Sequence, residues 1–102
     1  MTKTDSSDDE ISCATLLKVL ADDTRLEVVR QLMDGPRHVG ALNEKIPIDQ
    51  SLLSHHLKIL RESKIVQSRR DGKAVLYSLA PGVESRRKGK SINLGCCVIS
   101  FE

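Results

Sequence analysis

The sequence predicts an α+β domain that is mostly helical, in which a helix-turn-helix is followed by a two-stranded β-hairpin. Apolar residues recur at helical spacing through the first 63 residues, and two later runs of β-forming residues flank an Asp-Gly turn. Gly, Pro and Asp residues separate these segments. A chain of 102 residues can bury one modest core, so we expect one domain.

Two helices open the predicted fold. The first spans residues 11–20, and the second begins at an Asp cap within residues 21–23 and runs to Met33. The Asp-Gly-Pro sequence at 34–36 ends the second helix. Helical spacing predicts that the following side chains face the core: Leu16, Leu17 and Leu20, then Leu26, Val29 and Leu32 or Met33.

The helix-turn-helix comes next. A short third helix is predicted over residues 39–45, and residues 46–49, which include Pro47, form the turn. A fourth helix then extends to Ser63. Around it, Leu57 and Leu60 lie within about 40° of Leu53, as the buried stripe of an amphipathic helix should.

The opposite side of the fourth helix is polar. It gathers Ser51, Ser54, His55, Lys58 and Glu62. Small hydroxyls, an imidazole and an ammonium near the start of a helix suit the base edges and phosphates of a major groove. This face therefore indicates a nucleic-acid-binding function.

The two adjacent histidines have different predicted roles. His55 belongs to the polar face, where a base or phosphate contact is favoured over an idle surface position. His56 lies beside the leucine stripe, so we expect it to be half-buried and hydrogen-bonded locally. Neighbouring side chains on a helix point about 100° apart, so this pair cannot converge on one metal ion.

The two strand-like runs, residues 65–70 and 74–79, predict a hairpin with basic residues near its tip. The turn is formed by Asp71, Gly72 and Lys73. A helix-turn-helix followed by such a hairpin is the winged-helix arrangement. The chain thus divides into an acidic flexible tail (1–10), a winged helix-turn-helix DNA-binding domain (11–80), and a linker with a β-like C-terminal segment (81–102).

Charge is distributed unevenly along the chain. Residues 1–27 hold seven acids and three bases, whereas residues 58–102 hold ten bases and four acids. The net charge of +2 is uninformative by itself, because a groove binder needs its positive charge placed on one surface. A solvated mixed surface is the alternative interpretation, and a phosphate-facing edge is the one we favour.

The sequence argues against membrane and enzyme classes. No stretch approaches the roughly 20 apolar residues of a membrane span, and residues 1–10 hold no apolar signal region, so we expect a cytoplasmic protein. The sequence contains no Gly-rich phosphate loop, no His-Glu-x-x-His motif and no recognisable Ser-His-Asp set. We therefore predict no catalytic residues.

Three separated motifs resemble the ArsR/SmtB family of bacterial winged-helix repressors. They are residues 17–26 (LKVLADDTRL), 54–61 (SHHLKILR) and 70–77 (RDGKAVLY), and the resemblance extends from Leu16 to Leu79. It implies a homodimer that binds operator DNA without a required cofactor and leaves it when an inducer binds. It also implies that these residues contact DNA: Gln50, Ser51, Ser54, His55, Lys58 and, in the hairpin, Arg69, Arg70 and Lys73.

The inducer sites of the best-known family members are missing from this sequence. Positions matching the Cys-Val-Cys site of arsenic sensors are His38, Val39 and Gly40, and no histidine follows His56 to form the C-terminal zinc site. Other members resembling this chain carry their cysteines near the chain ends. By that resemblance the inducer is As(III) or Sb(III), held by the vicinal pair Cys96 and Cys97 with Cys13 as the candidate third ligand.

Cysteine chemistry supports this hypothesis and leaves alternatives open. Cytosolic thiols stay reduced, and thiolates prefer soft ions. In one regular strand, however, Cys96 and Cys97 would point to opposite faces unless Gly95 permits an irregular backbone. Cys13 alone can equally be a packed apolar residue. The alternatives are a redox- or persulfide-responsive repressor, a zinc or cadmium sensor, and a metal-handling protein-interaction module.

We also expect the two chain ends to form the dimer interface. The first helix and the apolar segment from Ser91 to Phe101 both offer apolar side chains beyond those that the core needs. An inducer bound at the ends would then act on the operator through the relative placement of the two subunits.

Overall fold

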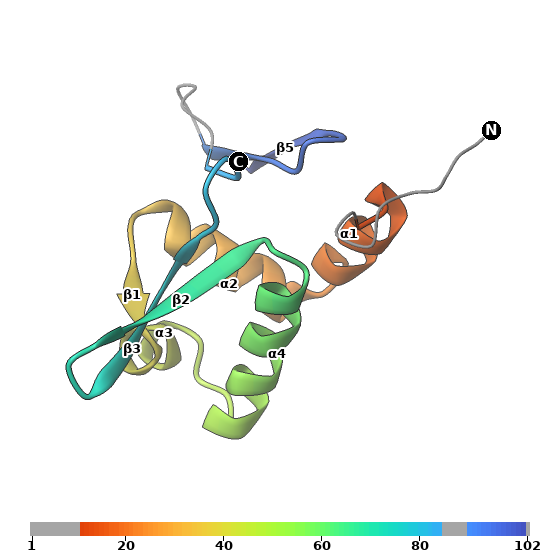
Figure 1. Cartoon of the computed structure of the whole chain (residues 1–102). Helices are drawn as coiled ribbons and strands as arrows, with labels where there is room; N and C mark the ends of the chain where they lie inside the picture. Colours follow the sequence, from red (N-terminus) through yellow and green to blue (C-terminus); the bar gives the residue numbers. More distant parts are fainter. Residues whose placement is uncertain (1–10, 85–89, 102) are drawn as a thin grey trace.

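The computed structural model of the protein describes residues 11–84 and 90–101. Figure 1 shows α2, α3 and α4 beside the sheet of β1, β2 and β3, with α1 and the β4–β5 hairpin far from the β2–β3 turn. The predicted fold class, a mostly helical α+β winged helix-turn-helix, is confirmed. In chain order the elements are α1 (Cys13–Leu20), α2 (Asp23–Met33), β1 (Arg37–His38), α3 (Val39–Lys45), α4 (Gln50–Glu62), β2 (Val66–Asp71), β3 (Ala74–Leu79), β4 (Lys90–Asn93) and β5 (Val98–Phe101).

Side-chain caps set the starts of α1, α2 and α4. Each cap accepts a hydrogen bond from a nearby backbone amide: Ser12 from Thr15 (3.1 Å), Asp22 from Arg25 (3.0 Å) and Asp49 from Ser51 (2.8 Å). The predicted Asp cap of the second helix is confirmed. The first helix begins at Cys13 instead of residue 11, because Ser12 is its cap. Within residues 11–84 and 90–101, no helix is long and apolar enough to cross a membrane.

The core lies between α2, α3, α4 and the start of β2. The predicted stripe of α4 is confirmed, since Leu53, Leu57 and Leu60 are fully buried. Val28, which the helical spacing did not single out, is also fully buried. The prediction for Leu17 is wrong, because its side chain is 45% exposed. Helix α1 buries Leu16 and Leu20, four residues apart, and Leu17 is turned about 100° from Leu16.

The end of α4 reverses the chain sharply into the sheet. Lys64 adopts the left-handed conformation (φ 63°). The amide of Ile65 donates to the Leu60 carbonyl (3.1 Å) and that of Lys64 to the Arg61 carbonyl (3.0 Å), which is the Schellman pattern. Ile65 is thereby buried against the core, directly before the wing begins.

The wing is an antiparallel sheet in the order β1-β3-β2. Strands β2 and β3 pair from Val66 with Leu79 to Asp71 with Ala74, around a turn in which Gly72 has φ 65°. The predicted hairpin is therefore present. The third strand, β1, was not predicted, because two residues carry no periodic pattern; its residues Arg37 and His38 pair with Tyr77 and Leu76.

The C-terminal segment is a second hairpin, and its backbone is irregular at Gly95, the alternative to one regular strand through the cysteines that the sequence left open. Strand β4 pairs with β5, with Ile92 opposite Ile99, and residues 94–97 form the turn. Gly95 adopts φ 90°, its amide donates to the Asn93 side chain (2.8 Å), and the Leu94 amide donates to the Cys97 carbonyl (2.9 Å). Ile92 is fully buried, which anchors the hairpin to the domain.

Candidate nucleic-acid interface and thiol cluster

The predicted DNA-contacting residues of α4 are all exposed, and all but Gln50, the first residue of the helix, lie on the side away from its leucine stripe. They are Gln50, Ser51, Ser54, His55 and Lys58. Because the buried leucines fix the rotation of α4, this polar face is held outward along the first two and a half turns of the helix. The face can offer hydroxyls, an amide, an imidazole and an ammonium to a groove.

Asp49 adds a negative charge beside this face. The Ser51 hydroxyl donates to the Asp49 carboxylate (2.6 Å), as does the Ser51 amide (2.8 Å), and these bonds hold the pKa of Asp49 below its usual value. The Ser51 hydroxyl proton is therefore engaged, which leaves its oxygen as an acceptor. From sequence, Asp49 was expected only as part of the turn before α4.

The predicted wing residues Arg69, Arg70 and Lys73 are exposed as well. Arg69 pairs with Leu76 and Arg70 with Val75, and adjacent residues of a strand point to opposite faces. The two guanidinium groups therefore leave the wing in opposite directions, with Lys73 at the tip between them. Only part of this set can approach one DNA backbone.

A hydrogen bond between side chains, which the sequence did not predict, ties the wing to the start of α3. His38 Nε2 lies 2.8 Å from an Asp71 carboxylate oxygen. His38 is in β1 and Asp71 ends β2, so the contact crosses β3, which separates the two strands. A pair separated by 33 residues carries no local signal, and only the strand register brings it together.

His56 is half-buried, as expected, but its predicted local hydrogen bond is not present at Nδ1, which is buried without a partner among the described residues. The His55 and His56 rings are 6.1 Å apart and tilted by 58°, so they do not converge. The Arg25 amide lowers the pKa of Asp22, and the charge of protonated His56 acts in the same direction. His56 thus links α4 electrostatically to the cap of α2.

All three cysteines come together, although 83 residues separate Cys13 from Cys96. Cys13 begins α1, and Cys96 and Cys97 occupy the β4–β5 turn. Cys13 and Cys96 form a disulfide with their Cα atoms 6.0 Å apart. The Cys97 sulfur lies 3.9 Å from that of Cys13 and 4.0 Å from that of Cys96.

The cluster can act in two chemical states. As a disulfide with a neighbouring thiol, it can undergo thiol–disulfide exchange. When reduced, its three sulfurs, all within 4.8 Å of one another, can ligate one soft ion. In both states the cluster joins α1 to the C-terminal hairpin, whereas the polar face of α4 and the wing tip lie elsewhere on the domain (Figure 1).

Known proteins share the helical part of this fold. A family model described as "Bacterial regulatory protein, arsR family" matches residues 22–68. The biofilm growth-associated repressor of Xylella fastidiosa is 42% identical over 79 residues, which cover 78% of this chain and 69% of that protein. The chain belongs to the ArsR family. This membership makes it a winged-helix transcriptional regulator that binds DNA, and its relatives are regulators, not enzymes.

Solved structures of ArsR-family regulators agree with this assignment. Reduced HlyU from Vibrio cholerae has a TM-score of 0.63 at 36% identity, covering 66% of this chain and 70% of that one. The homodimeric winged helix-turn-helix DNA-binding domain Mb0332 from Mycobacterium bovis also has a TM-score of 0.63, at 30% identity, covering 66% of this chain and 62% of that one. The matched family segment, residues 22–68, contains no cysteine.

Proposed function

We propose that this ArsR-family regulator is a homodimeric repressor that binds double-stranded operator DNA and is released by As(III) or Sb(III). The inducer would be held by Cys13, Cys96 and Cys97. The observation that carries this proposal is the convergence of all three sulfurs to within 4.8 Å, from two elements at opposite ends of the chain.

The DNA-binding surface consists of Gln50 at the start of α4, the polar face of that helix (Ser51, Ser54, His55 and Lys58), and one side of the wing, which presents Lys73 with either Arg69 or Arg70. Their exposure and their hydrogen-bonding groups support this role. The homodimeric relative Mb0332 supports a twofold assembly. Two copies of α4 would then enter successive major grooves, about 34–36 Å apart, on an operator with twofold symmetry.

The inducer would bind by exchange of its hydroxyl groups for thiolates. Arsenous acid, As(OH)₃, and three cysteine thiols form an As(S-Cys)₃ centre and three water molecules, and arsenic remains trivalent. The Cys13–Cys96 disulfide must first be reduced by a thiol reductant, as expected in a cytosol. Sulfur donors favour a soft, thiophilic ion over hard cations.

Inducer binding would act on DNA through the dimer. Helix α1 and the β4–β5 hairpin carry exposed apolar side chains, Leu17 and Val98, that suit an interface between subunits. An ion that joins these two elements favours one placement of the subunits over another. We expect this coupling to weaken operator binding by about 5- to 150-fold, the usual range for allosteric linkage.

A gel-shift titration on the DNA upstream of the gene tests the proposal. Reduced protein is titrated with arsenite, antimonite, zinc, cadmium and peroxide in turn, beside the Cys13→Ser, Cys96→Ser and Cys97→Ser variants. We expect release by arsenite and antimonite, which each variant weakens. Undiminished release from the Cys96 and Cys97 variants would remove the assignment, and release by zinc or cadmium alone would favour a metal sensor of that kind.

Redox sensing is a second candidate, favoured by the disulfide between Cys13 and Cys96. A disulfide needs only those two sulfurs, whereas trivalent arsenic uses all three. Cys97→Ser therefore separates the candidates: a redox sensor keeps its response to peroxide or polysulfide, and an arsenic sensor loses most of its response to arsenite. A protein-interaction module, by contrast, would show no salt-sensitive affinity for duplex DNA.

A further inference from the structure

We propose that a small, largely apolar pocket, formed in part by the two elements that carry the thiol cluster, binds the organic group of a monosubstituted trivalent arsenical, R–As(OH)₂. This inference rests on the proposed thiol function and narrows its ligand class. It predicts that the regulator responds more strongly to an aryl arsenical than to a methyl arsenical.

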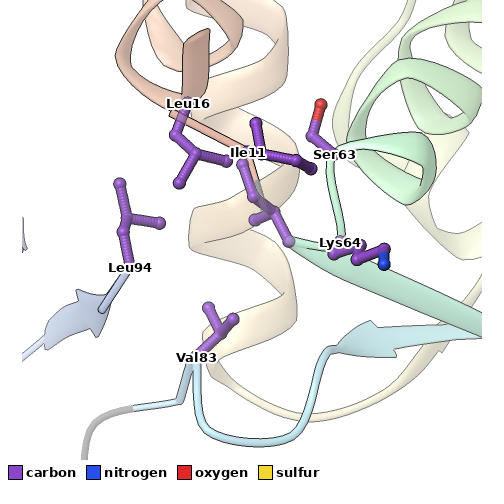
Figure 2. Close-up of a pocket in the computed structure, with 7 residues that line it drawn as sticks. Ile11, Leu16, Ser63, Lys64, Val83 and Leu94 are labelled. Atoms are coloured by element: carbon purple, nitrogen blue, oxygen red, sulfur yellow. The ribbon is translucent and has the colours of Figure 1, made fainter. Parts of the chain in front are cut away.

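The pocket lies between α1, the end of α4 and the C-terminal hairpin. Figure 2 shows Leu16, Ile11, Val83 and Leu94 around it, with Ser63 and Lys64 on one side. Its volume is about 180 Å³, and Ile65 completes the lining. The Ser63 hydroxyl donates to the Ile59 carbonyl (2.8 Å), so its proton does not need a hydrogen-bond acceptor on a bound molecule.

The pocket and the thiols are built on the same two elements. Leu16 follows Cys13 by three residues, so both lie on one face of α1. Leu94 is in the turn that holds the other thiols, and its amide donates to the Cys97 carbonyl (2.9 Å). Both elements thus carry a thiol and a pocket-lining leucine two or three residues apart, which would let an organic group on the arsenic atom reach the pocket.

The size of the pocket suits one aromatic ring. An engineered apolar cavity of about 150 Å³ in another protein binds benzene, so a pocket of similar volume and lining can take a phenyl group. A methyl group would leave most of the space unfilled. Burial of the additional apolar surface of phenyl should favour the aryl compound by about ten-fold or more.

The binding step keeps arsenic trivalent and conserves the arsenic–carbon bond. R–As(OH)₂ and two cysteine thiols give R–As(S-Cys)₂ and two water molecules. Cys13 and Cys97 are half-buried with their sulfurs 3.9 Å apart, whereas Cys96 is exposed. The first two are therefore assigned as the ligands of the organic arsenical, after a phosphine has reduced the disulfide.

The test measures release of labelled operator by the reduced full-length protein, using phenyl and methyl arsenicals and inorganic arsenite. For each protein we take the preference for the phenyl over the methyl arsenical from the concentrations that give half-maximal release. This preference is divided by the preference of dithiothreitol for the same two compounds, which corrects for their intrinsic affinity for thiols. We expect a corrected preference of about ten-fold for phenyl. Cys96→Ser should retain the phenyl response and weaken the arsenite response.

Ile11→Trp fills the pocket and should abolish the phenyl preference while arsenite still releases the protein. Lys18→Trp, an exposed change on α1, the helix that begins two residues after Ile11, is the matched control and should keep the preference. Leu94→Ala, which enlarges the pocket, supplies a second variant if Ile11→Trp disturbs folding, and should accept bulkier aryl groups.

Two outcomes would overturn the pocket proposal alone. If phenyl and methyl compounds release the operator equally after correction, the pocket does not hold the organic group. The second outcome combines two results: Ile11→Trp dissociates the dimer in sedimentation experiments, and the wild type shows no preference for the phenyl over the methyl compound. A side chain of the second subunit would then occupy the pocket. Failure of every arsenical, inorganic arsenite included, would remove the proposed function itself.

Discussion

The segment from α2 to the start of β2 and the two chain ends differ in packing and in chemistry. The central segment, residues 22–68, matches the ArsR family model and holds most of the fully buried side chains, including Leu53, Leu57 and Val28. The ends hold every cysteine and expose apolar side chains at Leu17 and Val98. A helix that is presented to DNA needs a rigid core to hold it. A sensing site needs only a few contacts with that core, so its residues can differ while the core stays the same.

The contacts between the two regions are few and specific. Helix α1 contributes Leu16 and Leu20 to the core, and the C-terminal hairpin contributes Ile92. The Asn93 amide donates to the Val83 carbonyl (2.7 Å), which joins the hairpin to the chain just beyond the wing. Under the proposed function, an inducer at the thiols would act on these two elements, which reach the core through Leu16, Leu20 and Ile92.

The largest expected effect comes from the core of the central segment. Leu57→Ala removes a fully buried side chain of α4, and we expect it to lower the free energy of unfolding by about 2–5 kcal/mol. Urea denaturation followed by circular dichroism measures this loss. Leu52→Ala on the same helix, at 47% exposure, should change stability by less than about 0.5 kcal/mol. Equal effects would contradict the division between core and surface.

A smaller effect is expected at the cap that links α2 to α4. Asp22→Ala should cost about 0.5–2 kcal/mol, because the Arg25 amide loses its acceptor. Since the pKa of Asp22 is lowered from 3.8, the stabilisation is present above that value and is lost as pH falls through the lower folded pKa.

Asp22→Asn isolates the pH effect, because Asn also caps helices but does not titrate. Its unfolding free energy should therefore decline less than that of the wild type when urea denaturation is repeated across the acid range. A decline identical to the wild type would show that Asp22 contributes nothing to the acid dependence.

The wing should contribute to DNA affinity through phosphates more than through base sequence. Lys73→Ala should reduce the slope of log Kd against log salt concentration by about one and weaken all sequences similarly. Fluorescence anisotropy with operator and unrelated duplexes checks this. Lys18→Ala, at the other end of the domain, should leave the slope unchanged, and an equal loss there would imply non-specific charge attraction.

The smallest effect is expected at the reversal after α4. Lys64 holds a left-handed conformation that glycine adopts without steric cost, so Lys64→Gly should stabilise the protein by about 0.5–1 kcal/mol. Lys58→Gly within the same helix should instead destabilise it by about 1 kcal/mol. Thermal unfolding of both variants shows whether their signs differ; destabilisation by Lys64→Gly would contradict the proposed strain.

Long, regular elements were predictable because local signals agree within them. In α4 the leucines at 53, 57 and 60 all indicate the same helix, and its exposed face followed from the same spacing. Strand β1 was not predictable, since it exists only through its pairing with β3. Leu17 was misassigned because Leu16, Leu17 and Leu20 allow more than one rotation of this short helix about its axis relative to the core.

Residue sets for the candidate sites could be proposed from the sequence, but their geometry could not. The chemistry of thiols suggested that Cys13 joins Cys96 and Cys97, but alternation along one strand separated the vicinal pair. The Asn93–Gly95 hydrogen bond and the left-handed conformation of Gly95 turn the chain there, so the alternation of a regular strand does not apply. The sulfurs of Cys96 and Cys97 consequently lie 4.0 Å apart. The contact between His38 and Asp71 depends on sheet register, which single-residue patterns do not specify.

The most direct test is the operator affinity of the reduced protein with and without arsenite, compared with a triple variant carrying Cys13→Ser, Cys96→Ser and Cys97→Ser. If the central segment binds DNA and the ends sense the inducer, both proteins bind equally without arsenite, and arsenite weakens only the wild type, by about 5- to 150-fold. Release of the triple variant by arsenite, or no release of the wild type, would contradict the account.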